Sequence, residues 1–458
     1  MTDSTPGQAK EIRLNMLEQC NPSFQAFGLW THPRDVSTGY TSIDYWVEYA
    51  KMLERGLFDN FFLADVYGIP DVFEGRADGA LKNGCQGPSL DPTVLLPAMA
   101  YATTNLCFTV TGSVTYEQPY QFARRFSTLD HMLDGRLGWN IVTSYLTSGA
   151  IAMGRDGLET HDTRYDIADE FLDGVYSLWE GSWDAGAVVR DKSAPLYVDP
   201  AKVRPVSLDG EHYRFTAIAA TETSPQRTPV LFQAGTSSRG KAFAAAHAEG
   251  VYINGTSKEV VAGHIADFRK VAADSGRDPR ALKFFMGISV FVDDTEQAAK
   301  DRHAEYLQYS STEGLMAMLS GAMGIDLSQY PLDERIEFQE NDSNRSVMEA
   351  MTRNNELTLR QALEARALNG TNLALVGSAE QVADELISWM DETDIDGFNI
   401  ARIVNHETTQ NFIDKVIPIL QERGRYKAAY GEGTFRERLF GDGPHLPEDH
   451  PAAQKRQY

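Results

Sequence analysis

Residues 229–248 read PVLFQAGTSSRGKAFAAAHA, a stretch that combines a strand pattern, a polar loop and a helix pattern. The apolar run at its start predicts a buried strand, and its alanine-rich end predicts a helix. The loop between them, QAGTSSRG (233–240), holds glycines, three hydroxyl side chains and Arg239. Free backbone amides at a helix N-terminus attract anions. The loop therefore predicts either an anion site, to which Arg239 adds charge, or an ordinary serine cap.

The motif content of this loop limits the anion. It lacks the GxxxxGK[ST] pattern that binds a nucleoside triphosphate and the GxGxxG pattern that binds a dinucleotide. A single terminal phosphate fits it better. The hydroxyl groups of Thr236, Ser237 and Ser238 would add hydrogen-bond donors for it.

Strand and helix patterns of this kind alternate along the whole chain, which is typical of repeated βα units around a parallel sheet. We therefore predict an α/β fold, a (β/α)₈ TIM barrel with insertions, as one domain over residues 1–458. The eight predicted strands are IRLNML (12–17), FFLAD (61–65), CFTVTGS (107–113), LGWNIVT (137–143), PVLFQAG (229–235), VYIN (251–254), KFFMGISVFV (283–292) and GFNIA (397–401).

One predicted helix shows why we assign such stretches to packing around the barrel. In residues 164–181 the large apolar side chains recur at spacings of three and four, which places them on one face. They are Ile167, Phe171, Val175, Leu178 and Trp179.

Two intervals of the sequence do not fit the alternation of strands and helices that a minimal barrel needs. Residues 182–228 contain Asp209-Gly210 between alternating β-formers, which predicts a hairpin. Residues 312–370 are long, polar and irregular, which favours a functional lid or an added subdomain.

Composition excludes several classes of partner. The 42 Lys and Arg residues against 65 Asp and Glu residues give a net charge of −23, which opposes nucleic acids and anionic membranes. No segment has the pattern of a signal peptide or membrane span, so we expect a cytoplasmic protein. The three cysteines are widely spaced and predict free thiols, and the histidines show no metal-binding spacing.

In such a barrel the reacting groups lie just after the strands. Asp65, followed by Tyr67, closes an apolar strand and predicts either a ligand contact or a helix cap. The small residues around Thr111 leave little bulk at the end of the third strand, so a flat ring has room against the backbone. The alternative is close packing inside the barrel.

Two further strand ends carry polar groups. Asn140 interrupts the fourth strand, which Ser144 and Tyr145 follow, and a buried amide there needs a ligand or a structural partner. His161 and Tyr165 are four residues apart and share one side of a helix start, where both can donate hydrogen bonds. An ordinary structural role is the alternative for each.

The chain offers no nucleophile arrangement of its own. GxSxG is absent, and no histidine is placed by sequence beside a candidate serine or cysteine. We therefore expect a bound cofactor to supply the chemistry, which the protein orients and shields.

With these residues assembled, the chain from about residue 12 to residue 441 resembles the bacterial luciferase-like flavin monooxygenases. Within them it is similar to the branch of long-chain alkane, dibenzothiophene-sulfone and nitrilotriacetate monooxygenases. The strings that carry the resemblance include LERGLFDNFFLADV (53–66), TYEQPYQFARRFSTLDHMLDGRLGWNIVTS (115–144), HDTRYDIADEFLDGVYSLWEGSW (161–183) and SPQRTPVLFQAGTSSRGKAFAAAHAE (224–249).

The resemblance implies an FMN-binding barrel that receives FMNH₂ from a separate NAD(P)H:flavin reductase. Reduced flavin in this family reacts with O₂ to a C4a-peroxide or hydroperoxide, which oxygenates a small or medium organic substrate. The resemblance also favours a homodimer or homotetramer. Residues implied to bind the cofactor are Asp65, Thr111, Asn140, Ser144 and Tyr145 at the ring, and His161, Tyr165, Thr236 and Ser237 at the phosphate.

The chain departs from well-known members where substrate is expected. Tyr145 stands where the alkane enzyme has histidine, and Asn21 matches its functional cysteine, with Cys20 one position away. Alkane hydroxylation is therefore not carried over. Candidate catalytic residues are Asn140, Tyr145 and Tyr67, and candidate substrate contacts are Asn21, Phe24, Phe27 and Tyr67.

Two other functions stay open at this point. One is hydride transfer by an oxidoreductase of the same barrel that uses the deazaflavin coenzyme F420. The other is a flavin-binding protein without catalysis.

Overall fold

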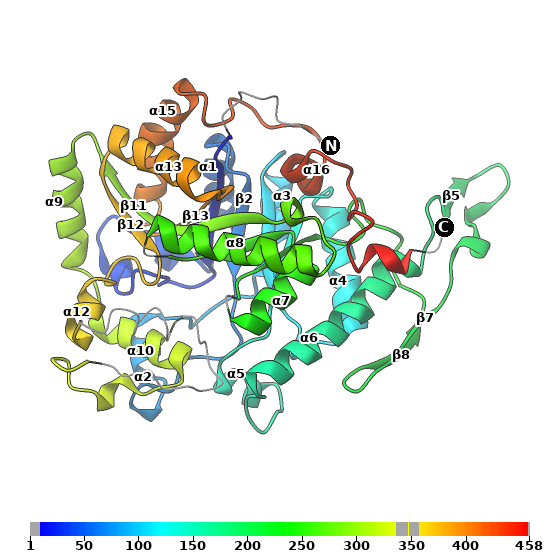
Figure 1. Ribbon diagram of the computed structural model, residues 1–458, viewed down its shortest axis with the longest axis horizontal. Helices are drawn as coiled ribbons and strands as arrows, with labels where there is room; N and C mark the ends of the chain where they lie inside the picture. The colour runs from blue at the N-terminus through cyan, green and yellow to red at the C-terminus, as the bar shows by residue number, and fades with distance from the viewer. Residues whose placement is uncertain (1–9, 236, 256, 336–346, 348–356, 457–458) are drawn as a thin grey trace.

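Eight parallel strands close into a barrel in the computed structural model, which describes residues 10–235, 237–255, 257–335, 347 and 357–456. Neighbouring strands follow the order β10-β9-β4-β3-β2-β1-β13-β11, and the pairing of β10 with β11 closes the ring. The predicted TIM barrel and its eight strands are confirmed (Figure 1). The barrel strands are β1 (Arg13–Gln19), β2 (Asn60–Ala64), β3 (Cys107–Ser113), β4 (Leu137–Val142), β9 (Val230–Gln233), β10 (Gly250–Ile253), β11 (Lys283–Asp293) and β13 (Gly397–Ala401).

Strand β12 (Leu373–Ser378) lies outside the barrel and was not predicted. It pairs with β11 from Ile288 to Asp293, whereas the barrel uses the earlier half of β11. The sequence shows only a short, half-apolar segment there, because one face of β12 stays partly exposed.

Helices cover the outside of the barrel, and side chains alternate between this layer and the interior. On β4, for example, Trp139 joins the main core formed with the helices, whereas Gly138 and Asn140 face inward. The apolar stripe predicted over residues 164–181 is buried in the same core, on the helix His161–Tyr176 and on the π-helical turn Ser177–Gly181 that continues it. The helices are α1 (Ile43–Arg55), α2 (Asp78–Asn83), α3 (Pro92–Tyr101), α4 (Pro119–Met132), α5 (Thr147–Ala152), α6 (His161–Tyr176), α7 (Ser238–His247), α8 (Lys258–Asp274), α9 (Glu296–Leu307), α10 (Thr312–Met323), α12 (Leu359–Glu364), α13 (Ala379–Thr393), α14 (Glu407–Asn411), α15 (Ile417–Glu422) and α16 (Phe435–Phe440).

The insertion at 182–228 forms two hairpins that project from the barrel at the right of Figure 1. Strands β7 (Val206–Asp209) and β8 (Arg214–Ala217) flank the predicted Asp209-Gly210 turn and pair antiparallel. A second hairpin, β5 (Val188–Asp191) with β6 (Leu196–Val198), was not predicted.

The first part of the insertion at 312–370 is regular and apolar, whereas the sequence predicted an irregular polar segment throughout. Residues 312–323 form the apolar helix α10, which packs with α2 and α12 around a second core (Figure 1). Residues 336–346 and 348–356 of this insertion lie outside the described residues. Within the described part of the chain, no helix is long and apolar enough to cross a membrane.

Candidate active site

The loop between β9 and α7 brings together the residues predicted to hold a phosphate. Ser237 is the N-cap of α7, and its Oγ accepts the N–H of Gly240 at 3.1 Å. The Nε2 of His161 lies 3.3 Å from the same Oγ. A Cβ at Gly235 would approach the hydroxyl of Tyr165 to 2.6 Å. His161, Tyr165 and Ser237 thus meet at one helix N-terminus, whereas Thr236 lies outside the described residues.

Gln233, at the end of β9, supports this loop and was missed by the sequence reasoning. Its Oε1 accepts the N–H of Gly235 at 2.7 Å, and its Nε2 lies 3.4 Å from the hydroxyl of Tyr165. The sequence did contain a signal for Gln233, because it is a polar residue at the end of an otherwise apolar strand. Gln233 therefore fixes both the turn and the tyrosine.

Arg239 does not add charge to the loop, contrary to the sequence expectation. Its guanidinium forms ion pairs with Asp166 at 3.0 Å and Asp169 at 2.5 Å on α6. The arginine thereby joins α7 to α6. An anion at this loop would therefore meet backbone amides, hydroxyl groups and the histidine.

A second loop of the same local sequence follows β10, which the sequence reasoning also missed. In the sequence NGTS (254–257), Ser257 caps α8 by accepting the N–H of Val260. The carboxylate of Glu259 interacts with its own amide and with Ser257, and these contacts lower its pKa. An internal carboxylate therefore already serves the α8 terminus, which distinguishes it from α7.

Next to this loop at the barrel mouth, β4, which pairs with β9, and its neighbour β3 present hydrogen-bonding groups. The Nδ2 of Asn140 donates to Thr111 Oγ1 at 3.0 Å. The Oδ1 of Asn140 is buried and has no partner among the described residues. Ser113 and Ser144 hydroxyls lie 2.9 Å apart, with Ser144 in the left-handed region at φ 57°. The unpartnered oxygen is suited to accept an N–H from a ring edge.

Tyr145 lies beside these groups and is held by Gln86. The Nε2 of Gln86 is 3.0 Å from the phenol oxygen, and burial raises the pKa of Tyr145 while this contact opposes the rise. Gln86 was missed because it stands in the irregular stretch GCQGP, which has no periodic signal. The amide orients the phenol.

Asp65 and Tyr67 follow β2 at the same mouth. Burial raises the pKa of Asp65 to about 7, the amide of Val66 opposes this, and the charges of Asp91 and Glu117 add to it. The hydroxyl of Tyr67 lies 3.4 Å from Glu117. The barrel mouth therefore offers a carboxyl group that can change protonation near neutral pH.

Comparison with known proteins decides the family. The family model described as luciferase-like monooxygenase matches residues 23–396. The chain belongs to this family. The predicted enzyme class, a flavin-dependent monooxygenase, is confirmed.

Relatives of this luciferase-like monooxygenase match it nearly end to end. The dimethyl-sulfide monooxygenase of Hyphomicrobium sulfonivorans is 42% identical over 452 residues, covering 98% of this chain and 94% of the relative. The long-chain alkane monooxygenase of Geobacillus thermodenitrificans (strain NG80-2) is 43% identical over 449 residues, covering 98% of each. A crystal structure of riboflavin lyase with modified FMN and riboflavin has a TM-score of 0.93 at 35% identity, covering 98% of this chain and 100% of that one.

The candidate substrate residues of this monooxygenase occupy different environments. Asn21 is fully buried, and neither atom of its amide has a partner within the described residues. Phe24 packs inside the barrel in a group of apolar side chains, the interior cluster, which includes Leu17, Phe62, Phe232 and Tyr252. Phe27 packs instead in the second core with α10. Phe27 therefore supports the added helices, and its contact with substrate stays a prediction.

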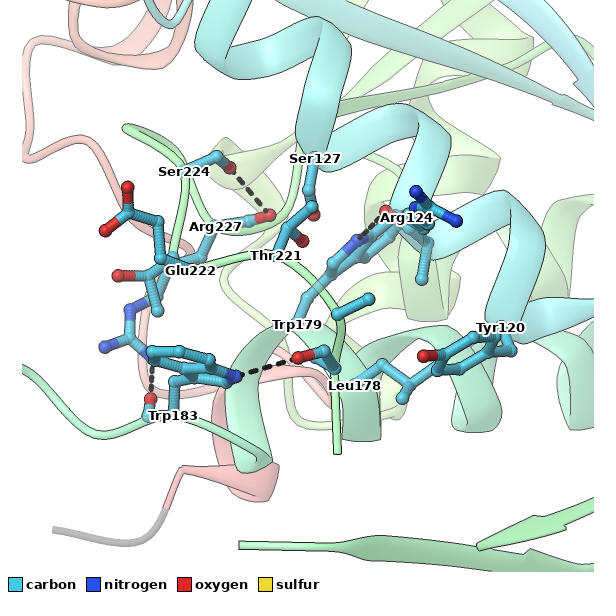
Figure 2. A pocket seen from close by; sticks show the side chains of 14 residues that line it. Tyr120, Arg124, Ser127, Leu178, Trp179, Trp183, Thr221, Glu222, Ser224 and Arg227 are labelled. Atoms are coloured by element: carbon cyan, nitrogen blue, oxygen red, sulfur yellow. Dashed lines mark hydrogen bonds between the residues drawn. The ribbon is translucent and has the colours of Figure 1, made fainter. Parts of the chain in front are cut away.

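A surface cleft elsewhere on the monooxygenase does not involve these residues. Trp183 and Tyr120 border it, with the segment 219–224 between them (Figure 2). Trp183 Nε1 donates to the carbonyl of Ala219 at 3.0 Å, which fixes the cleft wall. The cleft lies between α4 and the 182–228 insertion in the outer layer, so the barrel mouth remains the candidate site.

The raised pKa of Asp65 leads to a stability prediction for the monooxygenase without cofactor. The folded protein retains the Asp65 proton up to about pH 7, whereas the unfolded chain loses it near pH 3.8. Stability from this group is thus present below pH 3.8 and is lost as pH rises through 7. We expect Asp65→Asn to be more stable than the parent by about 1–3 kcal/mol at pH 8, and by much less at pH 4.5.

Thermal unfolding of both proteins at the two pH values measures this difference. An equal effect of Asp65→Asn at pH 4.5 and pH 8 would show that the carboxyl does not titrate in this range.

Proposed function

We propose that this protein is a two-component monooxygenase that uses FMNH₂ from a separate NAD(P)H:flavin reductase and oxygenates a small or medium organic substrate with O₂. One observation carries the proposal: two sets of groups lie at the same barrel mouth. His161 and Ser237 form a candidate phosphate site at the start of α7, and the Oδ1 of Asn140 is a hydrogen-bond acceptor without a partner among the described residues. The need for a reductase follows from the absence of a dinucleotide motif in the sequence.

The residues divide between the two ends of the cofactor. Ser237, His161 and Tyr165 hold the phosphate at the start of α7, where the helix dipole favours negative charge. Asn140 and Thr111 bind the polar edge of the ring. When bound, reduced FMN supplies the chemistry that activates O₂.

The loops after β2 and β4 complete the proposed site. Tyr67 and Tyr145 place two phenols at the mouth, and Asp65 holds or releases a proton near neutral pH. These groups orient substrate and control proton transfer in a space shielded from water. Asn21 and Phe24 are proposed to contact substrate.

An isotope experiment tests the function. The purified protein is mixed with anaerobically photoreduced FMN and a panel that includes dimethyl sulfide and a long-chain alkane, and ¹⁸O₂ is then admitted. We expect a product that carries one ¹⁸O atom. Failure to bind reduced FMN, together with no labelled product from a broad metabolite extract, would refute the proposal. Product formation with reduced F420 and no oxygen would instead support a hydride-transfer enzyme.

The proposed phosphate site at the start of α7 gives a separate prediction. Ser237→Ala should weaken FMN binding by about 0.5–3 kcal/mol, because a hydrogen bond to a charged group is lost. Binding of riboflavin, which lacks the phosphate, should change much less. Fluorescence titration of the protein with each oxidised flavin measures both constants.

Ser257→Ala is the matched control, because Ser257 caps α8 in a loop of the same local sequence. It should leave the FMN-to-riboflavin ratio unchanged. Equal losses of FMN and riboflavin affinity in Ser237→Ala would show that the phosphate binds elsewhere.

A further inference from the structure

Three asparagines form a row across the inner wall of the barrel. Asn15 on β1 stands in register with Asn399 on β13 and with Asn60 on β2. Asn60 and Asn15 lie two residues before Phe62 and Leu17, both in the interior cluster, so strand alternation turns the amides inward. All three are at least 97% buried.

Two more polar groups share this space. The ring of Tyr252 is stacked between Phe62 and Phe232, at centroid distances of 4.5 and 5.3 Å. Burial raises the pKa of Tyr252, and the neighbouring side chains of Thr109 and Asn60 oppose the rise. The phenol oxygen therefore faces these two side chains, although none of the three makes a hydrogen bond of good geometry with another.

This group of five residues leaves polar atoms without partners among the described residues. They are Asn15 Nδ2, both amide atoms of Asn60, Thr109 Oγ1, Tyr252 OH and Asn399 Oδ1. Buried polar groups without partners are costly, and proteins satisfy them with ordered water where at least two such groups converge. Phe435 and Leu439 of α16 lie in the same interior cluster as Val230, and they close the floor below.

Upward, a column of hydroxyl groups leads to the mouth. Thr109, Thr111 and Ser113 occupy alternate positions on β3 and face the interior together. Alternate residues lie roughly 6.6 Å apart, more than the roughly 5.5 Å that one water spans, so two waters in a bent chain are needed between successive hydroxyls. Thr111 binds Asn140, and Ser113 binds Ser144. The column thus ends at the proposed cofactor face.

We infer that Asn15, Asn60, Thr109, Tyr252 and Asn399 form a closed polar chamber that holds ordered water, and that the β3 hydroxyl column connects this water to the cofactor face. Each hydroxyl of the column can accept one proton while it donates another, so a proton that leaves the cofactor face is carried to the chamber water and returns by the same route, separate from bulk solvent. The chamber itself does not depend on the proposed function, whereas its role in proton exchange rests on it.

The chamber is tested on the protein without cofactor. A high-resolution crystal structure should show water within about 2.7–3.2 Å of Asn60, Thr109 or Tyr252. Asn60→Leu should lower the unfolding temperature by several degrees, because it removes a water partner and leaves Tyr252 and Thr109 unsatisfied. A dry interior with a raised unfolding temperature for Asn60→Leu would overturn the inference.

The connection is tested with reduced FMN. Thr109→Val removes the hydroxyl, and the pH-dependent reoxidation of bound reduced FMN should slow by up to about 100-fold, with a larger solvent isotope effect. Thr109→Ser should restore the parental profile, and the affinity of both variants for oxidised FMN should match the parent. Parental kinetics in Thr109→Val would refute the connection. A parent protein that does not bind reduced FMN refutes the proposed function and this role with it, whereas the structural test still decides the chamber.

Discussion

Replacing Arg436 with methionine is expected to lower the free energy of unfolding by about 3–5 kcal/mol, because it breaks a buried ion pair from one side. Arg436 on α16 is 2% exposed, and its Nε and Nη2 donate to the carboxylate of Glu249 at 2.7 and 2.9 Å. It also donates to backbone carbonyls just before β9, at Thr228 and Pro229. The variant leaves a buried carboxylate and buried carbonyls without these donors.

Urea unfolding of Arg436→Met and of Arg423→Met tests this prediction. Arg423 pairs with Glu380 and Asp384, whose side chains are 65% and 70% exposed, so its loss should cost less than about 1 kcal/mol. Equal losses in the two variants would contradict the assignment. The double variant Arg436→Met/Glu249→Leu should recover part of the loss, since no uncompensated charge remains.

The fold was predictable because each barrel strand carries its own signal. A short apolar run such as VLFQ or GFNIA is buried on both sides, and helix patterns separate these runs. β12 and the β5–β6 hairpin escaped prediction for the opposite reason. Their side chains are partly exposed, and their pairing is set by β11 in one case and by a local turn in the other.

Prediction of the site was uneven for a related reason. Residues at strand ends, such as Asn140 and Ser237, could be picked out from the sequence because barrel topology alone places them at the mouth. Gln86 was not, because its contact with Tyr145 joins two irregular loops. The orientation of the Arg239 side chain could not be predicted from the sequence either, because it is set by ion pairs with carboxylates on the neighbouring helix α6.

Gly149→Ala is expected to lower turnover about 100-fold while the fold is retained, because it moves the loop that carries Tyr67. A Cβ at Gly149 would lie 2.3 Å from the carbonyl oxygen of Tyr67, where ordinary contact begins at 3.4 Å. Gly68, at φ 91°, has no room for a side chain on the other side of the same contact. The Tyr67 loop must therefore retreat by about 1 Å, and displacements of that size cost roughly 100-fold in rate.

The measurement is kcat with the substrate that the labelling experiment identifies, alongside thermal unfolding. Gly157→Ala is the control, since nothing in the described part of the chain lies within 4 Å of its Cβ position and its φ is not in the left-handed region. Gly149→Ala should lose about 1–3 kcal/mol of stability, as overpacking does, and Gly157→Ala should keep parental turnover. Parental turnover in Gly149→Ala would mean that the spacing between the β2 and β4 loops does not set the geometry of the reaction. The position of Tyr67 would then not be critical to turnover.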